Sequence, residues 1–256
     1  MLKLLALVTA CLALSMGAQH DETIAARRRA SGVTPIFHSY AICATGGFSC
    51  LMISQSGGGT TSPTLPAGAS MYVACVGSTG GTMSIADTTS GSPDTFVVAN
   101  TAHTFGSAGV GVGWYVQSLV GGTTTVTCSS TVNTLFIEGA YIVFTGAVSS
   151  PTIDQVGELD LIAGTGGTVS LASTSGTTTH TNELAIGFVG NSHEYPQTWT
   201  NLTGVGTCVI PTALTGTYLW FMTYCPITAS GVTVTPQITT TANPTSANIS
   251  FVATFH

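Results

Sequence analysis

Three acidic residues, Asp154, Glu158 and Asp160, form the densest group of side chains in this sequence that could carry out chemistry. They lie in a stretch that we predict to be a loop. Two carboxylates at a suitable separation hydrolyse glycosidic bonds, whereas several carboxylate oxygens in one loop bind Ca²⁺. A solvated loop without a cofactor is the simplest interpretation, with Ca²⁺ as its first alternative. Asp87 and Asp94, on either side of a Ser- and Gly-rich turn, form a weaker Ca²⁺ candidate.

A second candidate is the segment 191–201, which combines aromatic and polar side chains in one predicted loop. Its central residues are His193, Glu194, Tyr195 and Trp199. Aromatic faces stack on sugar rings while polar groups orient the hydroxyls, and ligand sites commonly combine an apolar lining with a few polar groups. The alternative is a loop that Trp199 attaches to the core. We predict a ligand-binding loop here.

The sequence contains no motif that indicates nucleophilic or general-base catalysis. No Gly-x-Ser-x-Gly sequence, which marks many serine hydrolases, occurs in the chain. His38, His103, His180 and His193 could each act as a base, but none belongs to a recognisable catalytic arrangement. We therefore interpret them as surface or packing residues and predict that the protein is not an enzyme.

The cysteines predict disulfides. Cys11 lies in a predicted signal peptide, so an even number remains, as expected for a secreted chain with disulfides. Zinc binding is disfavoured because there is no Cys-x-x-Cys pair with histidines nearby. We predict pairing between neighbouring segments, with Cys43–Cys50 closing a hairpin across residues 45–47. The predicted pairs are Cys43 with Cys50, Cys75 with Cys128, and Cys208 with Cys225.

Positive charge ends early in the chain. The four basic residues are Lys3, Arg27, Arg28 and Arg29, whereas eight carboxylates follow residue 30. Nucleic-acid binding requires cationic groups that neutralise phosphates, so that class of partner is excluded. Only 5% of residues are charged and 44% are hydrophobic. Even so, no apolar run after residue 20 is long enough to span a bilayer, and we expect no membrane span in the mature chain.

The N-terminal region has the pattern of a secretory signal peptide followed by a leader. Residues 1–19 contain Lys3, an apolar stretch and small residues near a plausible cleavage point. A lipoprotein signal ending before Cys11 is the rival interpretation. Residues 20–30 form a polar leader ending in three arginines, which is either a second processing site or a solvated linker. Residues 31–256 then form one domain, secreted or at the cell surface.

Strand patterns dominate this domain, and helix-favouring residues are scarce. Residues 110–116 alternate apolar and small residues, as a half-buried strand does. Residues 218–224 are apolar on both faces, and residues 249–255 are apolar on one. Separate strands are predicted at 33–40 and 51–54, and again at 123–128 and 135–144. The pattern predicts an all-β fold, a single β-sandwich or jelly roll of roughly 10–14 short antiparallel strands.

Several segments resemble parts of β-sandwich, jelly-roll-like modules found in bacterial secreted proteins of unassigned function. They are residues 82–88, 142–146 continuing through 151–154, 177–187, and 251–255. Such modules often have an acidic residue before the aromatic–small–Gly turn, where this chain has Val143. The resemblance spans most of residues 60–255. It implies a sandwich fold and no particular activity.

Three functions fit these observations. The first is a non-enzymatic extracellular binding or adhesion module whose partner is a glycan or another surface polymer. The second is a structural subunit of an extracellular filament or coat, in which residues 33–40, released by cleavage at Arg27–Arg29, pair with a neighbouring copy. The third is a glycoside hydrolase that uses the acidic group. Fold alone does not decide among them, because sandwiches host many functions.

Overall fold

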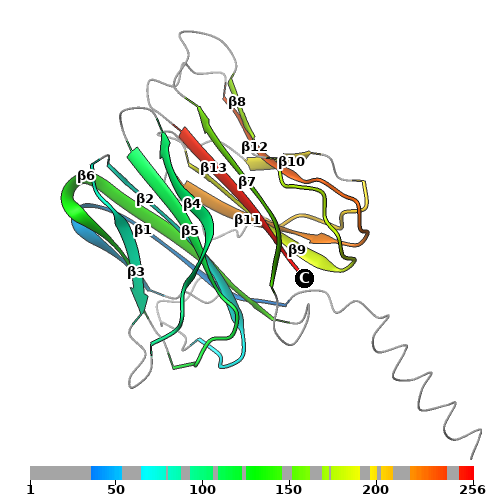
Figure 1. The fold of residues 1–256 in the computed structure, drawn as a ribbon, viewed down its shortest axis with the longest axis horizontal. Helices are drawn as coiled ribbons and strands as arrows, with labels where there is room; N and C mark the ends of the chain where they lie inside the picture. Colours follow the sequence, from blue (N-terminus) through cyan, green and yellow to red (C-terminus); the bar gives the residue numbers. More distant parts are fainter. Residues whose placement is uncertain are drawn as a thin grey trace, which may run out of the picture. The chain divides into compact units, whose positions relative to one another are not determined.

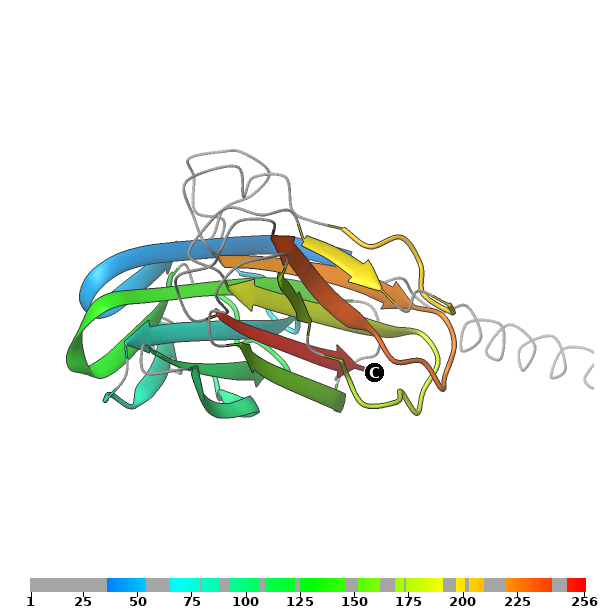
Figure 2. The ribbon, with the colours of Figure 1, turned by 90° about the horizontal axis from the view of Figure 1, so that it is seen from above.

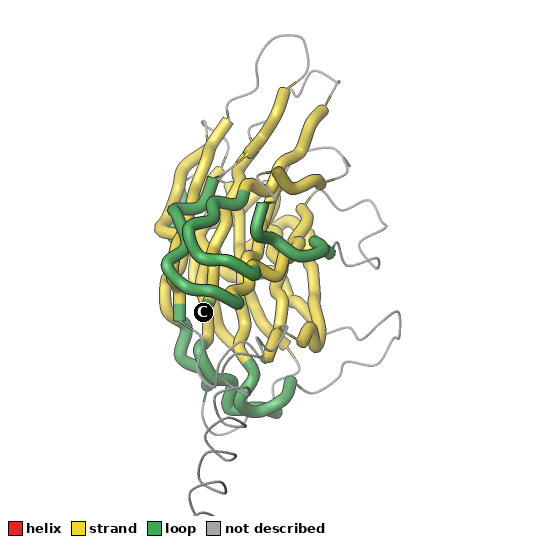
Figure 3. The backbone as a smooth tube through the Cα atoms, turned by 90° about the vertical axis from the view of Figure 1, so that its right-hand side faces the viewer, coloured by secondary structure: helices red, strands yellow, loops and turns green. Residues whose placement is uncertain are grey.

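Strands β1 to β13 make up the regular structure of the part of the chain that the structure describes, and no helix occurs there (Figure 1, Figure 3). This computed structural model describes residues 36–53, 65–78, 80–87, 93–105, 109–122, 125–145, 152–161, 169–172, 174–190, 197–200, 203–209, 220–240 and 248–256. They belong to one unit, Thr34–His256. The all-β prediction is therefore confirmed. The predicted signal peptide and leader lie outside the described residues.

The strands form three antiparallel sheets. Their bounds are β1 (Ile36–Ile53), β2 (Ser70–Ser78), β3 (Met83–Asp87), β4 (Val97–Phe105), β5 (Gly109–Val116), β6 (Thr125–Thr145), β7 (Ile153–Leu161), β8 (Val169–Ala172), β9 (Glu183–Gly190), β10 (Gln197–Thr200), β11 (Trp220–Ile227), β12 (Thr235–Thr240) and β13 (Asn248–Phe255). A six-stranded sheet has the order β1-β6-β2-β5-β4, with β3 also paired to β6. A four-stranded sheet has the order β11-β9-β13-β7, and a three-stranded sheet the order β10-β12-β8. Among the described residues, no helix is long and apolar enough to cross a membrane.

The two longest strands, β1 and β6, pair with each other from end to end. Ile36 lies opposite Thr145, and Ile53 lies opposite Thr125. The prediction of a hairpin across residues 45–47 is therefore wrong, because the backbone continues through this point with only a shift of register. Gly47 absorbs the shift with a φ of +123°, a conformation that glycine adopts without a steric penalty. The strands predicted separately at 33–40 and 51–54 are therefore parts of the single strand β1. Those predicted at 123–128 and 135–144 are parts of β6.

Both faces of strand β2, inside the six-stranded sheet, are buried. On β2, Tyr72, Ala74 and Val76 face a core shared with the four-stranded sheet, which we call the inter-sheet core. The alternate residues of β2 face a second core, and both ends of β6 contribute to it, with Val126 near one end and Val143 near the other. Residues from the two ends of β6 reach the same cluster because the sheet curls over itself. Figure 2 shows β1 and β6 bending together in this way.

The inner strands of the four-stranded sheet, β9 and β13, are also buried on both faces. On β13, Phe251 and Phe255 enter the inter-sheet core, whereas Val252 enters a third cluster with Ala185 and Ile227. The prediction that residues 249–255 present an apolar face inward is confirmed. These alternating assignments follow from the two-residue period of a strand.

Strand β5 shows why its alternating pattern contains glycine. Val112, Trp114 and Val116 fill the second core. Gly111 lies on the opposite face, where an added Cβ would come within 2.6 Å of Ile249 Cδ1. The glycine therefore lets the four-stranded sheet approach closely.

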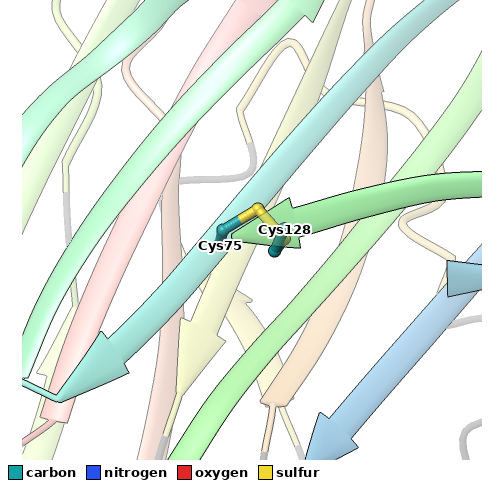
Figure 4. Close-up of a disulfide and its surroundings, with 2 residues drawn as sticks. All are labelled: Cys75 and Cys128. Atoms are coloured by element: carbon teal, nitrogen blue, oxygen red, sulfur yellow. A yellow bond between two sulfur atoms is a disulfide. The ribbon is translucent and has the colours of Figure 1, made fainter. Parts of the chain in front are cut away.

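Two disulfides match the predicted pairing. Cys75–Cys128 joins β2 to β6 within the second core (Figure 4). Cys208–Cys225 joins β11 to the segment that precedes it. Cys50 is also disulfide-bonded, and the side chain of Cys43 lies outside the described residues. Each such bridge stabilises a fold by about 2–4 kcal/mol, in large part by restricting the unfolded chain.

A substitution at Gly139 tests this packing. A Cβ at Gly139 would lie 2.5 Å from Cys128 Sγ and 3.1 Å from Met52 Sδ. Overpacking of this kind typically costs about 1–3 kcal/mol, so we expect Gly139→Ala to lower the free energy of unfolding by that amount in urea titrations of the oxidised protein. Gly206→Ala is the control, because its nearest neighbours lie at 3.5 Å. Equal stability of the two variants would contradict the close contact at the disulfide.

Candidate functional site

The acidic residues predicted to share a loop lie instead on strand β7. Pairing with β13 runs from Thr254 opposite Gln155 directly to Phe255 opposite Ile153, so Asp154 has no partner of its own. This extra residue is a β-bulge, a feature that redirects side chains and is frequent beside functional sites. The loop prediction is therefore wrong for this segment, and the bulge determines where Asp154 points.

Asp154, His180 and Glu183 converge at the end of the four-stranded sheet where β7 and β9 begin. We call these three residues the Asp154 cluster. One potential ligand atom from each lies within 4.8 Å of those from the other two, a spacing that could hold a metal ion. His180 Nδ1 lies 3.7 Å from Asp154 Oδ1. Among the described residues, one group of at least three Asp, Glu, His or Cys side chains has its ligand atoms this close together, and it is the Asp154 cluster.

The segment before β9 fixes this geometry through its backbone. Thr179 donates its N–H to Asp154 Oδ2 and its hydroxyl to Asp154 Oδ1, each at 2.6 Å. The N–H of His180 donates to Glu183 Oε1 at 3.0 Å. Between them, Asn182 adopts a φ of 63°, a left-handed conformation that asparagine tolerates better than most residues. The turn therefore aims two carboxylates and one imidazole at a common point.

A second histidine supports the first. The rings of His180 and His256 stack with centroids 3.7 Å apart and planes inclined by 9°. His256 Nε2 lies 2.7 Å from Thr152 Oγ1, and backbone hydrogen bonds between Thr152 and His256 run in both directions. Burial, followed by the neighbouring His180, lowers the pKa of His256. Its ring is thus held in place as a neutral face against which His180 packs.

The two carboxylates of the cluster differ in environment. The side chain of Glu183 is fully buried, and burial raises the pKa of this carboxyl to about 7 against the opposing effects of the His180 N–H and the Thr254 hydroxyl. Burial also opposes ionisation of Asp154, but hydrogen bonds from Thr179, with smaller contributions from the Glu183 and Gln155 side chains, outweigh it and lower the pKa of Asp154. Asp154 therefore ionises at lower pH than Glu183, and of the two carboxyls it is Glu183 that holds a proton for part of the time near neutral pH.

Glu158 belongs to a different part of the molecule. It accepts the backbone N–H of Thr101 on β4 at 2.8 Å and lies 3.7 Å from His103 Nδ1. The contacts of Asp154 are with residues 179–183 instead, so the structure does not bring Asp154 and Glu158 together. The predicted carboxylate pair and shared Ca²⁺ site are wrong on this point, because the two residues contact different elements from one strand. The side chain of Asp160 lies outside the described residues.

Asp87 and Asp94 serve a structural role. Asp87 accepts the backbone N–H of Asp94 through both oxygens, at 3.3 and 3.4 Å. Asp94 Oδ1 accepts the backbone N–H of Val120 at 2.7 Å. These bonds connect the segment before β4 to β3 and to the segment after β5, a function that needs no Ca²⁺.

Glu138 is a buried carboxyl on β6. It is 6% exposed and lies opposite Val76 of β2. Within the described structure, its Oε2 atom has no hydrogen-bond partner. Burial raises the pKa of Glu138 to about 8. The side chain is therefore neutral at physiological pH.

The predicted aromatic loop is described only in part. Residues 191–196, and with them His193, Glu194 and Tyr195, lie outside the described residues. The backbone of Trp199 lies on β10, opposite Pro236 of β12, at one edge of the three-stranded sheet. The Trp199 side chain lies outside the described residues. The ligand-binding role of this segment remains a prediction.

Sequence reasoning considered His180 only as an isolated base and did not connect Glu183 or His256 with it. The available signal was local. His180 and Glu183 are separated by two residues just before an apolar strand, which places both at the strand's start. The missing information was that β7 begins and β13 ends at this same edge of the sheet.

No protein-family model matches the chain, and no curated protein is significantly similar to it. Among solved structures, the chain is similar to a BuGH86 variant in complex with neoagarooctaose, with 11% sequence identity and a TM-score of 0.19. The alignment covers 87% of this chain and 34% of that chain. Similarity at this level carries no argument about fold or function. The resemblance to modules of bacterial secreted proteins stays a prediction.

The pH dependence of stability tests the state of Glu138. Unfolded Glu138 loses its proton near the ordinary value of 4.5, whereas folded Glu138 keeps it up to about 8. The contribution of Glu138 to stability is therefore fully present below pH 4.5. It falls as the pH rises from 4.5 to about 8, by up to about 1.4 kcal/mol per pH unit. We expect Glu138→Gln to match the wild type in acid and to exceed it at pH 8 by roughly 2–5 kcal/mol in urea unfolding.

Glu183 loses part of its own stabilisation in the same window, since its pKa is raised to about 7. A shallower slope should therefore persist in the Glu138→Gln variant. Identical pH profiles for the variant and the wild type would show that Glu138 ionises normally in the folded protein.

Proposed function

We propose that the chain is a secreted, non-enzymatic binding module that recognises a neutral glycan. The observation that supports the proposal is the bonding of the domain's carboxylates to its own main chain. Five carboxylates accept hydrogen bonds from the protein's own backbone, and they are Asp87, Asp94, Asp154, Glu158 and Glu183. Acids engaged in this way hold elements together, which leaves the domain's exposed polar surface largely to hydroxyl and amide groups.

The close carboxylates of the Asp154 cluster do not favour hydrolysis. A glycosidase needs one carboxyl that protonates the leaving oxygen and a second that attacks or activates water, and both must reach the sugar. Glu183 is the member of the pair with the higher pKa, yet its side chain has no exposed surface. It therefore has no route by which to protonate a substrate in solvent. This burial supports binding over catalysis.

A glycan is the ligand class that best fits the chemistry of the surface. After residue 29 the chain has no Lys or Arg, so anionic polymers lack a cationic counterpart. Neutral hydroxyl-bearing ligands require hydrogen-bonding groups and aromatic faces instead. The segment 191–201 supplies both types of residue, and its last part forms the edge strand β10.

A glycan-array screen followed by calorimetry tests this proposal. We expect at least one neutral oligosaccharide to bind, and Trp199→Ala to weaken that binding at least about tenfold, since Trp anchors carry much of the energy of binding sites. Phe48→Ala is the matched aromatic control, because Phe48 is 57% exposed on β1 in a different sheet. Equal losses in the two variants, or no binding by the wild type, would refute a glycan site at Trp199.

A second function, assembly into an extracellular filament or coat, is favoured by one feature of β1. This strand forms an edge of the six-stranded sheet and exposes Phe48 and Leu51 by 57% and 54%. Edge strands of monomeric proteins are usually protected by charged residues or proline, and β1 contains neither Lys, Arg, Asp, Glu nor Pro. An apolar, uncharged edge is suited to pairing with another copy.

Electron microscopy of the secreted material tests this second function. Assembly through β1 predicts polymers at high protein concentration, with a mature N-terminus near residue 30 by mass spectrometry. Leu51→Lys should abolish the polymers by placing a charge on the edge. Val120→Lys, at a residue 51% exposed outside any strand, should leave them intact. Dispersed particles at every concentration would exclude the filament.

A further inference from the structure

The Asp154 cluster contains no Lys or Arg to balance its two acids, and its basic group is the His180 imidazole. Asp154 and Glu183 bring two carboxyl groups close to one imidazole. In most proteins a neighbouring Lys or Arg would neutralise such a pair, but this chain has no Lys or Arg after residue 29. Compensation must therefore come from a proton or from a cation outside the chain.

The buried oxygen of Glu183 is an independent sign of a missing partner. Oε1 of Glu183 accepts the His180 N–H, whereas Oε2 is buried and makes no hydrogen bond of ordinary geometry within the described structure, although the Thr254 hydroxyl and the Asp154 carboxyl lie near this side chain. Buried polar atoms without a partner are rare in folded proteins, and each one calls for an explanation such as a bound ion. The side chain is fully buried and belongs to the group of converging ligand atoms.

The donor set indicates which class of ion would fit. Ca²⁺ and Mg²⁺ prefer oxygen ligands alone, whereas imidazole together with carboxylate suits Zn²⁺ and similar divalent transition ions. Ligands of a tetrahedral Zn²⁺ ion at 2.0–2.1 Å lie about 3.4 Å apart. The 3.7 Å between His180 Nδ1 and Asp154 Oδ1 is close to that spacing.

The surroundings already hold these ligands in place. Thr179 fixes Asp154 through two hydrogen bonds, and the ring of His256 stacks on that of His180. Second-shell contacts of this kind orient ligands and strengthen metal sites. The His180 side chain is 48% exposed, so an ion at this point has a path from solvent.

We propose that Asp154, His180 and Glu183 form a binding site for a divalent transition-metal ion of the Zn²⁺ class. The ion takes one oxygen from each carboxylate and Nδ1 from the imidazole, which in the metal-free chain lies 2.9 Å from the Thr179 hydroxyl and gives up that contact when the ion binds. A fourth position faces solvent on the side of the exposed imidazole, where water or a group from a binding partner completes the coordination.

Calorimetric titration of Zn²⁺ into the metal-stripped full chain tests the site. We expect saturable binding of one ion per chain and a rise in the thermal unfolding midpoint, with no comparable binding of Ca²⁺. His180→Ala and Glu183→Gln should each weaken Zn²⁺ binding at least tenfold, because loss of a second-shell partner alone commonly costs 10- to 100-fold. Circular dichroism of each variant establishes that it is folded.

His103→Ala is the matched control. His103 also lies 3.7 Å from a carboxylate, that of Glu158, so a general affinity of His–carboxylate pairs for zinc would affect both variants equally. Unchanged binding in His103→Ala together with loss in His180→Ala supports the site. Equal binding in His180→Ala and the wild type, a preference for Ca²⁺, or no saturable binding overturns it. If Glu183→Gln fails to fold, the exposed His180 still provides the test.

Discussion

Carboxylates in this domain find their hydrogen-bond donors on the backbone, and the arrangement of the connecting segments depends on that pairing. With no Lys or Arg after residue 29, side-chain ion pairs of the usual kind are not available. Asp94 instead binds the N–H of Val120, and Glu158 binds that of Thr101. Hydrogen bonds to charged groups contribute about 1.5–3 kcal/mol each, and unlike surface ion pairs they connect one element directly to the main chain of another. Glu138 satisfies the same constraint differently, since burial keeps it protonated.

The sheets supply the rigid frame that these bonds complete. Because strands β2, β9 and β13 are buried on both faces, they have little freedom to move relative to their neighbours. The bulge at Asp154 and the left-handed Asn182 are local departures from that regularity. Both occur at the same end of the four-stranded sheet. Irregular backbone at the edge of a rigid frame is where proteins commonly place function.

The sequence indicated the class of fold because strand patterns are local. The alternation in residues 110–116 and 249–255 required only neighbouring residues, and so did the pairing of Cys208 with Cys225. The sequence pattern gave wrong predictions for segments whose structure depends on the strand with which they pair. Residues 45–47 have the composition of a turn, yet pairing with β6 on both sides keeps them in a strand. Asp154 and Glu158 looked like one acidic group, but strand geometry directs them to different elements. The Asp154 cluster was hidden for the same reason, since Asp154 and Glu183 meet only after β7 and β9 have both paired with β13.

The pairing of β1 with β6 has a consequence for how the domain forms. The first strand is hydrogen-bonded to the sixth, so Ile36 gains its partner only once Thr145 is present. Closing such a long loop costs conformational entropy before the contacts compensate for it. Proteins dominated by contacts between distant segments fold in milliseconds to seconds, much more slowly than helical bundles of similar stability. The rate at which this domain reaches its native state is therefore limited by its topology, and β1, the first strand of the sheet, depends for its partner on residues that come about a hundred positions later in the chain.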